Sequence, residues 1–284
     1  MLFKKKEKKE KKENWQIYAI EVDNTSSEIA DFFEQRFDSV IKQKLQIYTE
    51  VDKEKIKEET KNLFKEYLQE EPRKNILAVY GSGYFHHLTY GLCSLIDKEY
   101  GYIHLDRHSD GYDPYKVNIK SSKVSHNRFV NSIRRDTKCG DCFLIGSFLF
   151  PCEDIYKSIK RGDLEEKLEE GLKKLPNDVY LSFDLDVMSN NDITTDFGQG
   201  SLRLNDMLRI IDFIQNKKSI IGADILGLAA GQHLLVRKAK DSDCSSTIKP
   251  DRRKRGKLLY GVVACKLIGK NYRELKKEFD STYI

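Results

Sequence analysis

Short apolar segments alternate along this chain with segments of helical spacing, and this alternation constrains the fold more than any other feature of the sequence. Strands that alternate with helices form βαβ units, and continuous apolar strands are typical of a parallel sheet that helices cover on both faces. The pattern therefore predicts an α/β fold with three αβα layers and a mostly parallel central sheet. The expected strands are 16–22, 76–80, 102–106, 143–146, 179–184, 220–224 and 259–265, and the expected helices are 53–70, 87–98, 164–174, 204–215 and 272–280.

Charge is distributed unevenly along the chain. The formal net charge is +5, but residues 1–13 carry +4 and residues 249–257 carry +5, so the remainder is net −4. We expect residues 1–14 to be a flexible charged tail, and residues 15–284 to be a single domain because no Pro- or Gly-rich linker divides them. The run 249–257 could bind nucleic acid or an acidic partner. We prefer a solvated loop before the last strand, because charge runs are usually solvated.

Several classes of protein do not fit the sequence. No apolar run approaches the ~18 residues of a transmembrane helix, and the lysine-rich start lacks the apolar stretch of a signal peptide. Six cysteines in 284 residues do not make a disulfide framework, and we expect Cys139 and Cys142 to lie in a turn with buried thiols. Aromatic and basic residues do not interleave as they do in nucleic-acid-binding surfaces. We therefore expect a cytoplasmic protein that acts neither at a membrane nor on nucleic acid.

Histidine and aspartate concentrate where three of the expected strands end. Because ligands of such sheets bind beyond the carboxyl ends of the strands, we expect these side chains to converge. Carboxylates crowded at a buried edge repel one another, and two divalent cations would resolve that conflict. Solvated loop residues are the alternative, but three clusters at three strand ends make coincidence improbable. The clusters are His86 and His87, then Asp106, His108 and Asp110 in a D-x-H-x-D pattern, and Asp184 and Asp186 in a D-x-D pattern.

These segments resemble the metal-binding motifs of the ureohydrolases, the family of arginase, agmatinase and formimidoylglutamase. The sequences GSGYFHHLT, IHLDRHSD and SFDLDV stand in the family's chain order, within roughly residues 76–230. Arg107 stands where the family usually has Ala, and Tyr84-Phe85 is an insertion. The resemblance implies an arginase-like fold, a small-molecule substrate and two divalent ions, with Mn²⁺ foremost and Fe²⁺, Co²⁺ or Zn²⁺ as alternatives. It also implies that a hydroxide between the ions cleaves a C–N bond of a guanidino or amidino compound.

The resemblance also implies individual roles. Asp110 would orient the attacking hydroxide, and His126 would shuttle protons at the site entrance. His87 remains a rival to His86 as a ligand, and a surface-loop histidine is the alternative reading of His126. Family members are commonly oligomeric, so a homo-oligomer is a further expectation. As metal ligands, the resemblance implies Asp106 and Asp184 bridging both ions, His86 and Asp110 on one ion, and His108 and Asp186 on the other.

One departure bears on the substrate. Gly227 occupies the position of the glutamate that binds the substrate guanidinium in the family, and Arg107 adds a positive charge inside the metal motif. A buried guanidinium needs a carboxylate partner, so we expect an uncharged or anionic substrate. Two other functions stay open: a catalytically silent binding protein, and a mononuclear deacetylase-like amidase that uses Asp106, His108 and Asp184.

Overall fold

A single parallel sheet organises the chain. The computed structural model describes residues 15–70, 72–113, 115, 121–147, 149–229 and 250–282, so the predicted tail 1–14 lies outside the described residues. Eight parallel strands form the sheet in the order β2-β1-β4-β10-β9-β5-β7-β8. The predicted α/β class is confirmed. The strands are β1 (Trp15–Glu21), β2 (Val40–Lys44), β4 (Asn75–Val79), β5 (Tyr100–Leu105), β7 (Cys139–Gly146), β8 (Phe150–Pro151), β9 (Asp178–Asp184) and β10 (Ser219–Leu226), and a separate antiparallel pair is formed by β3 (Glu50–Asp52) and β6 (Lys123–Ser125).

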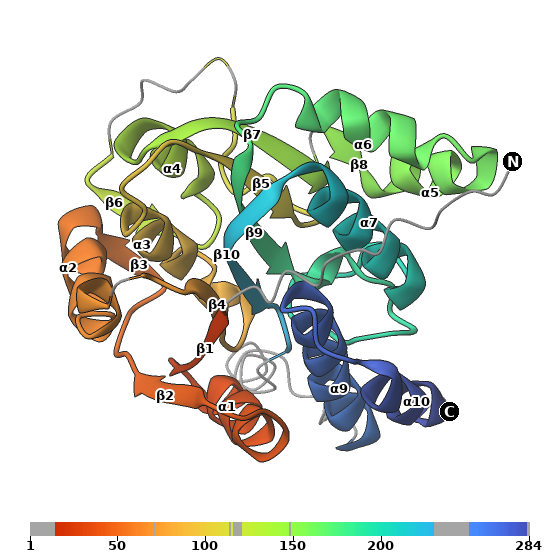
Figure 1. The fold of residues 1–284 in the computed structure, drawn as a ribbon, viewed down its shortest axis with the longest axis horizontal. Coiled ribbons are helices and arrows are strands. Elements are labelled where there is room, and N and C mark those ends of the chain that lie inside the picture. Colours follow the sequence, from red (N-terminus) through yellow and green to blue (C-terminus); the bar gives the residue numbers. More distant parts are fainter. Residues whose placement is uncertain are drawn as a thin grey trace, which may run out of the picture.

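Helices cover both faces of the sheet, which gives the three predicted layers (Figure 1). Successive residues of β1 alternate between two cores: Ile17 and Ala19 belong to one, and Tyr18 and Ile20 to the other. No described helix is long and apolar enough to cross a bilayer. The helices are α1 (Asn24–Arg36), α2 (Lys53–Leu63), α3 (Leu88–Ser94), α4 (Val130–Asp136), α5 (Cys152–Arg161), α6 (Leu164–Leu172), α7 (Leu204–Lys217), α9 (Pro250–Leu267) and α10 (Arg273–Ser281).

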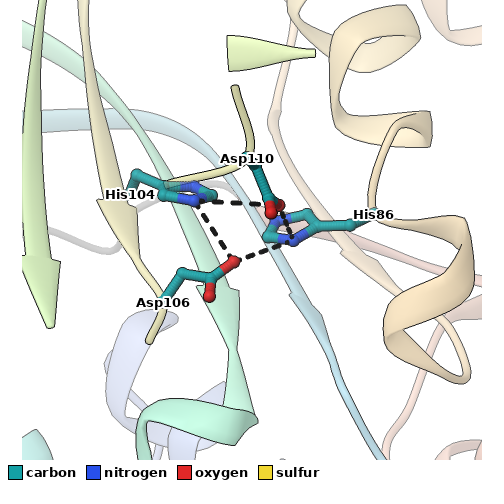
Figure 2. A group of neighbouring side chains, drawn as sticks. All are labelled: His86, His104, Asp106 and Asp110. Carbon is teal, nitrogen blue, oxygen red and sulfur yellow. Dashed lines mark ion pairs between the residues drawn. The ribbon is translucent and has the colours of Figure 1, made fainter. Parts of the chain in front are cut away.

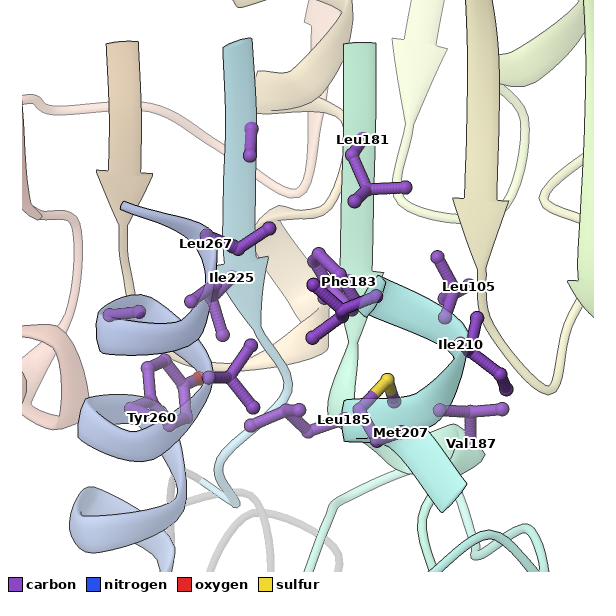
Figure 3. Packing of buried hydrophobic residues seen from close by; sticks show 14 of the residues in the cluster. Leu105, Leu181, Phe183, Leu185, Val187, Met207, Ile210, Ile225, Tyr260 and Leu267 are labelled. Atoms are coloured by element: carbon purple, nitrogen blue, oxygen red, sulfur yellow. The ribbon is translucent and has the colours of Figure 1, made fainter. Parts of the chain in front are cut away.

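The larger core lies between the sheet and the helices α1, α5, α6, α7 and α9. Figure 3 shows Leu105 and Phe183 of the sheet beside Met207 and Ile210 of α7. The buried residues of α7 recur at intervals of three and four positions, so one stripe of this helix faces the strands. This packing fixes the central strands, whose carboxyl ends carry the predicted site.

The prediction of a last strand at 259–265 is wrong, because these residues lie in α9. Every residue from Leu258 to Cys265 is buried, so the segment has no polar face. A short continuous apolar run fits a buried strand as well as a buried helix, and periodicity cannot separate the two. Here the run belongs to a helix of 18 residues.

The basic run is also part of α9, so the predicted solvated loop is wrong for residues 250–257. Its side chains pair with carboxylates of other elements. Arg253 and Lys257 both contact Glu28 of α1, and Lys254 lies 3.4 Å from Glu278 of α10. The positive charge of this run therefore lies against negative charge within the same molecule.

Cys139 and Cys142 lie in β7, so the predicted turn before this strand is wrong, whereas the prediction of buried thiols is confirmed. The register between β5 and β7 shifts by one residue between Cys139 and Asp141, as in a β-bulge. Both cysteines are buried, and their sulfur atoms are 3.8 Å apart. Gly140 is the residue that the bulge accommodates.

Tyr260 ties α9 to the edge of the sheet that carries the predicted site. Its hydroxyl lies 3.1 Å from the carbonyl oxygens of Tyr80 and of Gly81, just after β4. The same hydroxyl accepts the N–H of Leu228, just after β10, at 3.1 Å. One buried side chain thus joins the ends of two neighbouring strands.

Candidate metal centre

The six predicted metal ligands converge at the carboxyl ends of β4, β5 and β9, which lie near the middle of the sheet. A short 3₁₀ turn, Gly83–Phe85, carries the chain from β4 to His86. Asp106, His108 and Asp110 follow β5 directly, Asp184 ends β9, and Asp186 lies in the next 3₁₀ turn. The His108 side chain is 44% exposed, whereas the other five predicted ligands are buried.

One set of ligand atoms lies deep in the sheet edge, and we call it the inner group: His86, His104, Asp106 and Asp110. The Nδ1 atom of His86 lies 2.9 Å from Asp110 Oδ2 and 3.2 Å from Asp106 Oδ2. Asp184 Oδ2 is 3.5 Å from the same nitrogen. His104 was not among the predicted ligands; its Nε2 is 3.2 Å from Asp106 Oδ2 (Figure 2).

The second set, the outer group, consists of Asp106, His108 and Asp186. His108 Nδ1 lies 2.7 Å from Asp186 Oδ2 and 3.4 Å from Asp106 Oδ1. The backbone N–H of Arg107 donates to Asp186 Oδ1 at 3.0 Å. Asp106 therefore belongs to both groups and presents Oδ2 to the inner group and Oδ1 to the outer group.

His86, rather than His87, faces these carboxylates. Ser182 donates its hydroxyl proton to Asp224 at 2.6 Å, so its oxygen can accept a hydrogen bond from His86 Nε2, 3.0 Å away. This arrangement leaves the lone pair of His86 Nδ1 directed at the inner group. The Nε2 atom of His87 lies instead 2.8 Å from the carbonyl of Tyr48. Burial lowers the pKa of His87 to about 4.

Asp110 has a backbone conformation that is rare for residues other than glycine, with φ of 44°. The N–H groups of Phe129 and Val130 both donate to its carbonyl at 3.1 Å and hold it in place. Strained residues of this kind are common at functional sites, where the surrounding structure maintains them.

The pKa values of the carboxylates in this site differ strongly from those of the same groups in solution. Burial, followed by repulsion from Asp186 and Asp106, raises the pKa of Asp184 well above its usual range. Burial and the charge of Asp106 raise the pKa of Asp186 to about 7. Burial also acts upward on Asp106, but its histidine neighbours outweigh that effect and hold its pKa well below the usual range. The cluster thus has a strong need for positive charge.

The donor set fits divalent cations. Among the described residues, His104 Nε2 and Asp186 Oδ2 are buried and form no well-aligned hydrogen bond, although each has an ion-pair contact. Imidazole nitrogens mixed with carboxylate oxygens suit ions from Mn²⁺ to Zn²⁺. The inner and outer groups could therefore each hold one such ion.

The predicted proton shuttle His126 belongs to neither group and lies in an aromatic cluster with Tyr84 and Phe197. The His126 ring stacks on Phe197 with 5.2 Å between centroids, and Tyr84 lies 4.4 Å from Phe197 and 5.5 Å from His126. Phe197 is 6.3 Å from His108. The aromatic cluster therefore lies beside the half-exposed ligand of the outer group.

Gly227 lies against Asp184, so its backbone position leaves no space for a side chain. Its φ is 107°, and a Cβ atom would lie 2.3 Å from Asp184 Oδ1 and 2.8 Å from the backbone nitrogen of Leu185. A glutamate here would have to displace Asp184 or the backbone beside it.

Comparison with solved structures places this geometry in a known architecture. A hypothetical agmatinase from Burkholderia thailandensis matches 94% of this chain and 87% of its own with a TM-score of 0.58 and 16% identity. The chain has the arginase–agmatinase fold. The agmatine ureohydrolase of Thermoplasma volcanium (TM-score 0.58, 15% identity, 94% and 92% covered) and the arginase of Bacillus subtilis (0.56, 18%, 90% and 99%) are similar in the same way. No family model and no curated protein matches the sequence. Structural similarity at such low sequence identity establishes the fold but not the activity. The activity must therefore be inferred from the residues of the site.

Proposed function

We propose that this chain is a divergent ureohydrolase, a metal-dependent hydrolase that cleaves a non-peptide C–N bond in a small molecule. The observation that carries the proposal is the position of Asp106, whose two carboxylate oxygens face two different groups of ligands. A carboxylate shared in this way is suited to bridge two ions. It lies at the carboxyl edge of an arginase-like sheet, where such folds bind ligands.

In this proposal His86, Asp106 and Asp110 would hold one ion, and Asp106, His108 and Asp186 would hold the other. Asp184 would complete the centre, since its Oδ2 lies 3.5 Å from His86 Nδ1. When bound, ions of the series Mn²⁺ to Zn²⁺ would polarise the substrate and lower the pKa of water, with Mn²⁺ the ion that the resemblance favours.

The chain's own residues would supply the proton transfers. Asp110 would accept a hydrogen bond from the attacking water and so orient it, because its carboxylate belongs to the inner group, 2.9 Å from His86 Nδ1. His126 would return a proton to the leaving nitrogen, because an imidazole exchanges protons readily near neutral pH. His126 contacts Tyr84 and stacks on Phe197, and Phe197 in turn lies 6.3 Å from His108 of the outer group.

The substrate of this proposed enzyme would be uncharged or anionic. A desolvated guanidinium needs a carboxylate partner, and the backbone at Gly227 leaves no space for the family's glutamate. Arg107 contributes positive charge instead, with its guanidinium against Gly198. Turnover of arginine or agmatine at rates typical of the family would contradict this substrate class.

The test is an activity screen on full-length protein reconstituted with Mn²⁺, Co²⁺ or Zn²⁺, over guanidino, amidino, formimino and amide compounds. Released urea and ammonia are measured separately, so the products identify the bond that is cleaved. We expect hydrolysis of an uncharged or anionic member by the wild type and none by Asp106→Asn. A protein that binds ions and hydrolyses none of these compounds would overturn the enzymatic proposal in favour of a binding function.

A further inference from the structure

His104 is the residue of the inner group that none of the three predicted clusters includes. We infer that His104 is an additional protein ligand of the ion held by the inner group, an inference that rests on the proposed metal function. The inner group would then offer two imidazoles, from His86 and His104, together with the carboxylates of Asp106 and Asp110.

The strand places His104 in the site. It lies in β5 two residues before Asp106, so both side chains leave the sheet edge on the same side. The residue is fully buried, and its ring stacks on that of His86 at 5.0 Å between centroids. Figure 2 shows the side chains of His86, His104, Asp106 and Asp110 directed toward a common centre.

The distance between His104 and Asp106 matches the separation of two ligands of one ion. His104 Nε2 lies 3.2 Å from Asp106 Oδ2 and 3.9 Å from Asp110 Oδ2, yet it forms no aligned hydrogen bond among the described residues. Two ligands that each lie about 2.1 Å from a shared ion are roughly 3.0–3.4 Å apart for bond angles of about 90–110°. A close contact without hydrogen-bond alignment is what two ligands of one cation would show.

Tyr102 fixes the ring from its other side. Its hydroxyl lies 2.9 Å from His104 Nδ1, and both residues are fully buried. Metal-binding histidines almost always use the second nitrogen in such a hydrogen bond, which sets the tautomer and the orientation of the ring. In the tautomer in which Nδ1–H donates to Tyr102, the Nε2 lone pair faces two carboxylate oxygens, and a cation between them would satisfy all three atoms.

A second imidazole would also change the preferred metal. Imidazole suits Fe²⁺, Co²⁺ and Zn²⁺, whereas carboxylate and water oxygens suit Mn²⁺. We therefore expect the inner position to prefer Co²⁺ or Zn²⁺ over Mn²⁺ more strongly than the outer position, which has one histidine.

The experiment is a Co²⁺ titration of full-length protein, followed by calorimetry and by the visible absorption of the bound ion. His104→Phe keeps a ring of similar shape and removes the nitrogen. We expect one of the two Co²⁺ equivalents to weaken by at least about 10–100-fold and its absorption bands to change. His87→Phe is the matched control, a buried histidine next to His86 that faces away from the site; both equivalents and the spectrum should be retained.

Tyr102→Phe provides a second route to the same answer, because it leaves the ligand in place and removes only its support. We expect about a 10-fold loss at the inner position. Co²⁺ affinities and spectra of His104→Phe that equal those of the wild type would overturn the inference. If circular dichroism shows that His104→Phe does not fold, the Tyr102→Phe variant decides: wild-type Co²⁺ affinity at the inner position would then overturn the inference. A wild-type protein that binds no Co²⁺ would instead overturn the proposed function itself.

Discussion

At the scale of single residues, the orientation of His86 depends on side chains that bind no ion. Asp224 accepts hydrogen bonds from Ser182 and from Tyr180, and Ser182 in turn faces His86 Nε2. Because the proton of Ser182 is committed to Asp224, the serine oxygen acts as the acceptor for His86. This relay directs the His86 lone pair toward the carboxylates.

We predict that Ser182→Ala lowers the affinity for the inner ion by about 10–100-fold. The change leaves His86 Nε2 without its partner and removes one donor from the buried Asp224, at a cost of about 1–3 kcal/mol in the free energy of unfolding. Metal titration and chemical denaturation measure the two effects. Ser158→Ala, a buried serine of α5 outside the site, should keep full affinity; equal metal binding in both variants would refute the relay.

A matched pair of glycines tests the contact between Gly227 and Asp184. Gly227 and Gly269 both have positive φ, of 107° and 69°, but a Cβ at Gly269 would meet no atom within 4 Å. We predict that Gly227→Ala loses bound metal because the new methyl group displaces Asp184, whereas Gly269→Ala keeps it and shows only the modest cost of backbone strain. Metal analysis after purification distinguishes them. Equal metal content in the two variants would contradict the steric account.

The predicted ligands can be recognised from their spacing in the sequence, whereas the residues of the site that were not predicted cannot. Asp106, His108 and Asp110 stand close together after a strand, so their spacing alone indicates a site. His104, Ser182 and Asp224 lie inside strands that read as apolar core. The sheet register sets Ser182 opposite both His104 and Asp224. A single sequence does not specify which strands are neighbours, so this row of polar residues could not be predicted.

At the scale of elements, α9 shows why its segment was predicted as a strand and a loop. Its apolar half is buried on all sides, and its basic half pairs with α1 and α10. Both halves therefore lack the amphipathic spacing by which helices are recognised in sequences. The inner strands β1, β4, β5, β7, β9 and β10 were predicted, because each contains a buried apolar run with a polar boundary. The two end strands, β2 and β8, were not predicted: β2 is only partly buried and β8 has two residues.

Arg255 anchors α9, and its replacement tests whether the basic run stabilises the fold. Its side chain is 7% exposed and lies 3.2 Å from Asp192 Oδ1, with the guanidinium 3.6 Å from the centre of the Phe279 ring. Arg203 and the N–H of Leu204 still contact the other oxygen of Asp192, each at 3.0 Å. Arg255→Met therefore removes one of two cations from this buried carboxylate and should cost about 1–3 kcal/mol of stability. Urea denaturation measures this, with the exposed Lys254→Met as control. A loss no larger than that of the control would refute the anchoring role.

At the scale of the whole molecule, the net charge of +5 is a sum of unlike parts. Of the basic run, Arg253, Lys254 and Lys257 are paired with carboxylates of α1 and α10, while the centre of the sheet edge concentrates four buried aspartates. The described part of the chain therefore buries several carboxylates at one place, where a cation would relieve their mutual repulsion. Cations that fill this site should stabilise the entire fold, because binding to the native state alone shifts the unfolding equilibrium.

We predict that Co²⁺ or Mn²⁺ at a free concentration of 100 times Kd raises the free energy of unfolding by about 2.7 kcal/mol per site. For a domain of this size that corresponds to a rise in Tm of roughly 5–10 °C. Differential scanning calorimetry with and without the ion measures it, and Mg²⁺ serves as the comparison because it suits oxygen ligands rather than histidine. An unchanged Tm at saturating Co²⁺ would contradict the account.

The central claim, that one carboxylate joins two cation sites, is tested most directly by metal stoichiometry. Wild type, Asp106→Asn and Asp23→Asn are loaded with Co²⁺, freed of excess ion and analysed for bound metal; Asp23 caps α1 beside Gly81, and asparagine caps helices equally well. We predict two equivalents in the wild type and in Asp23→Asn, and neither in Asp106→Asn. Two equivalents retained by Asp106→Asn, or the loss of only one, would contradict the shared role of Asp106.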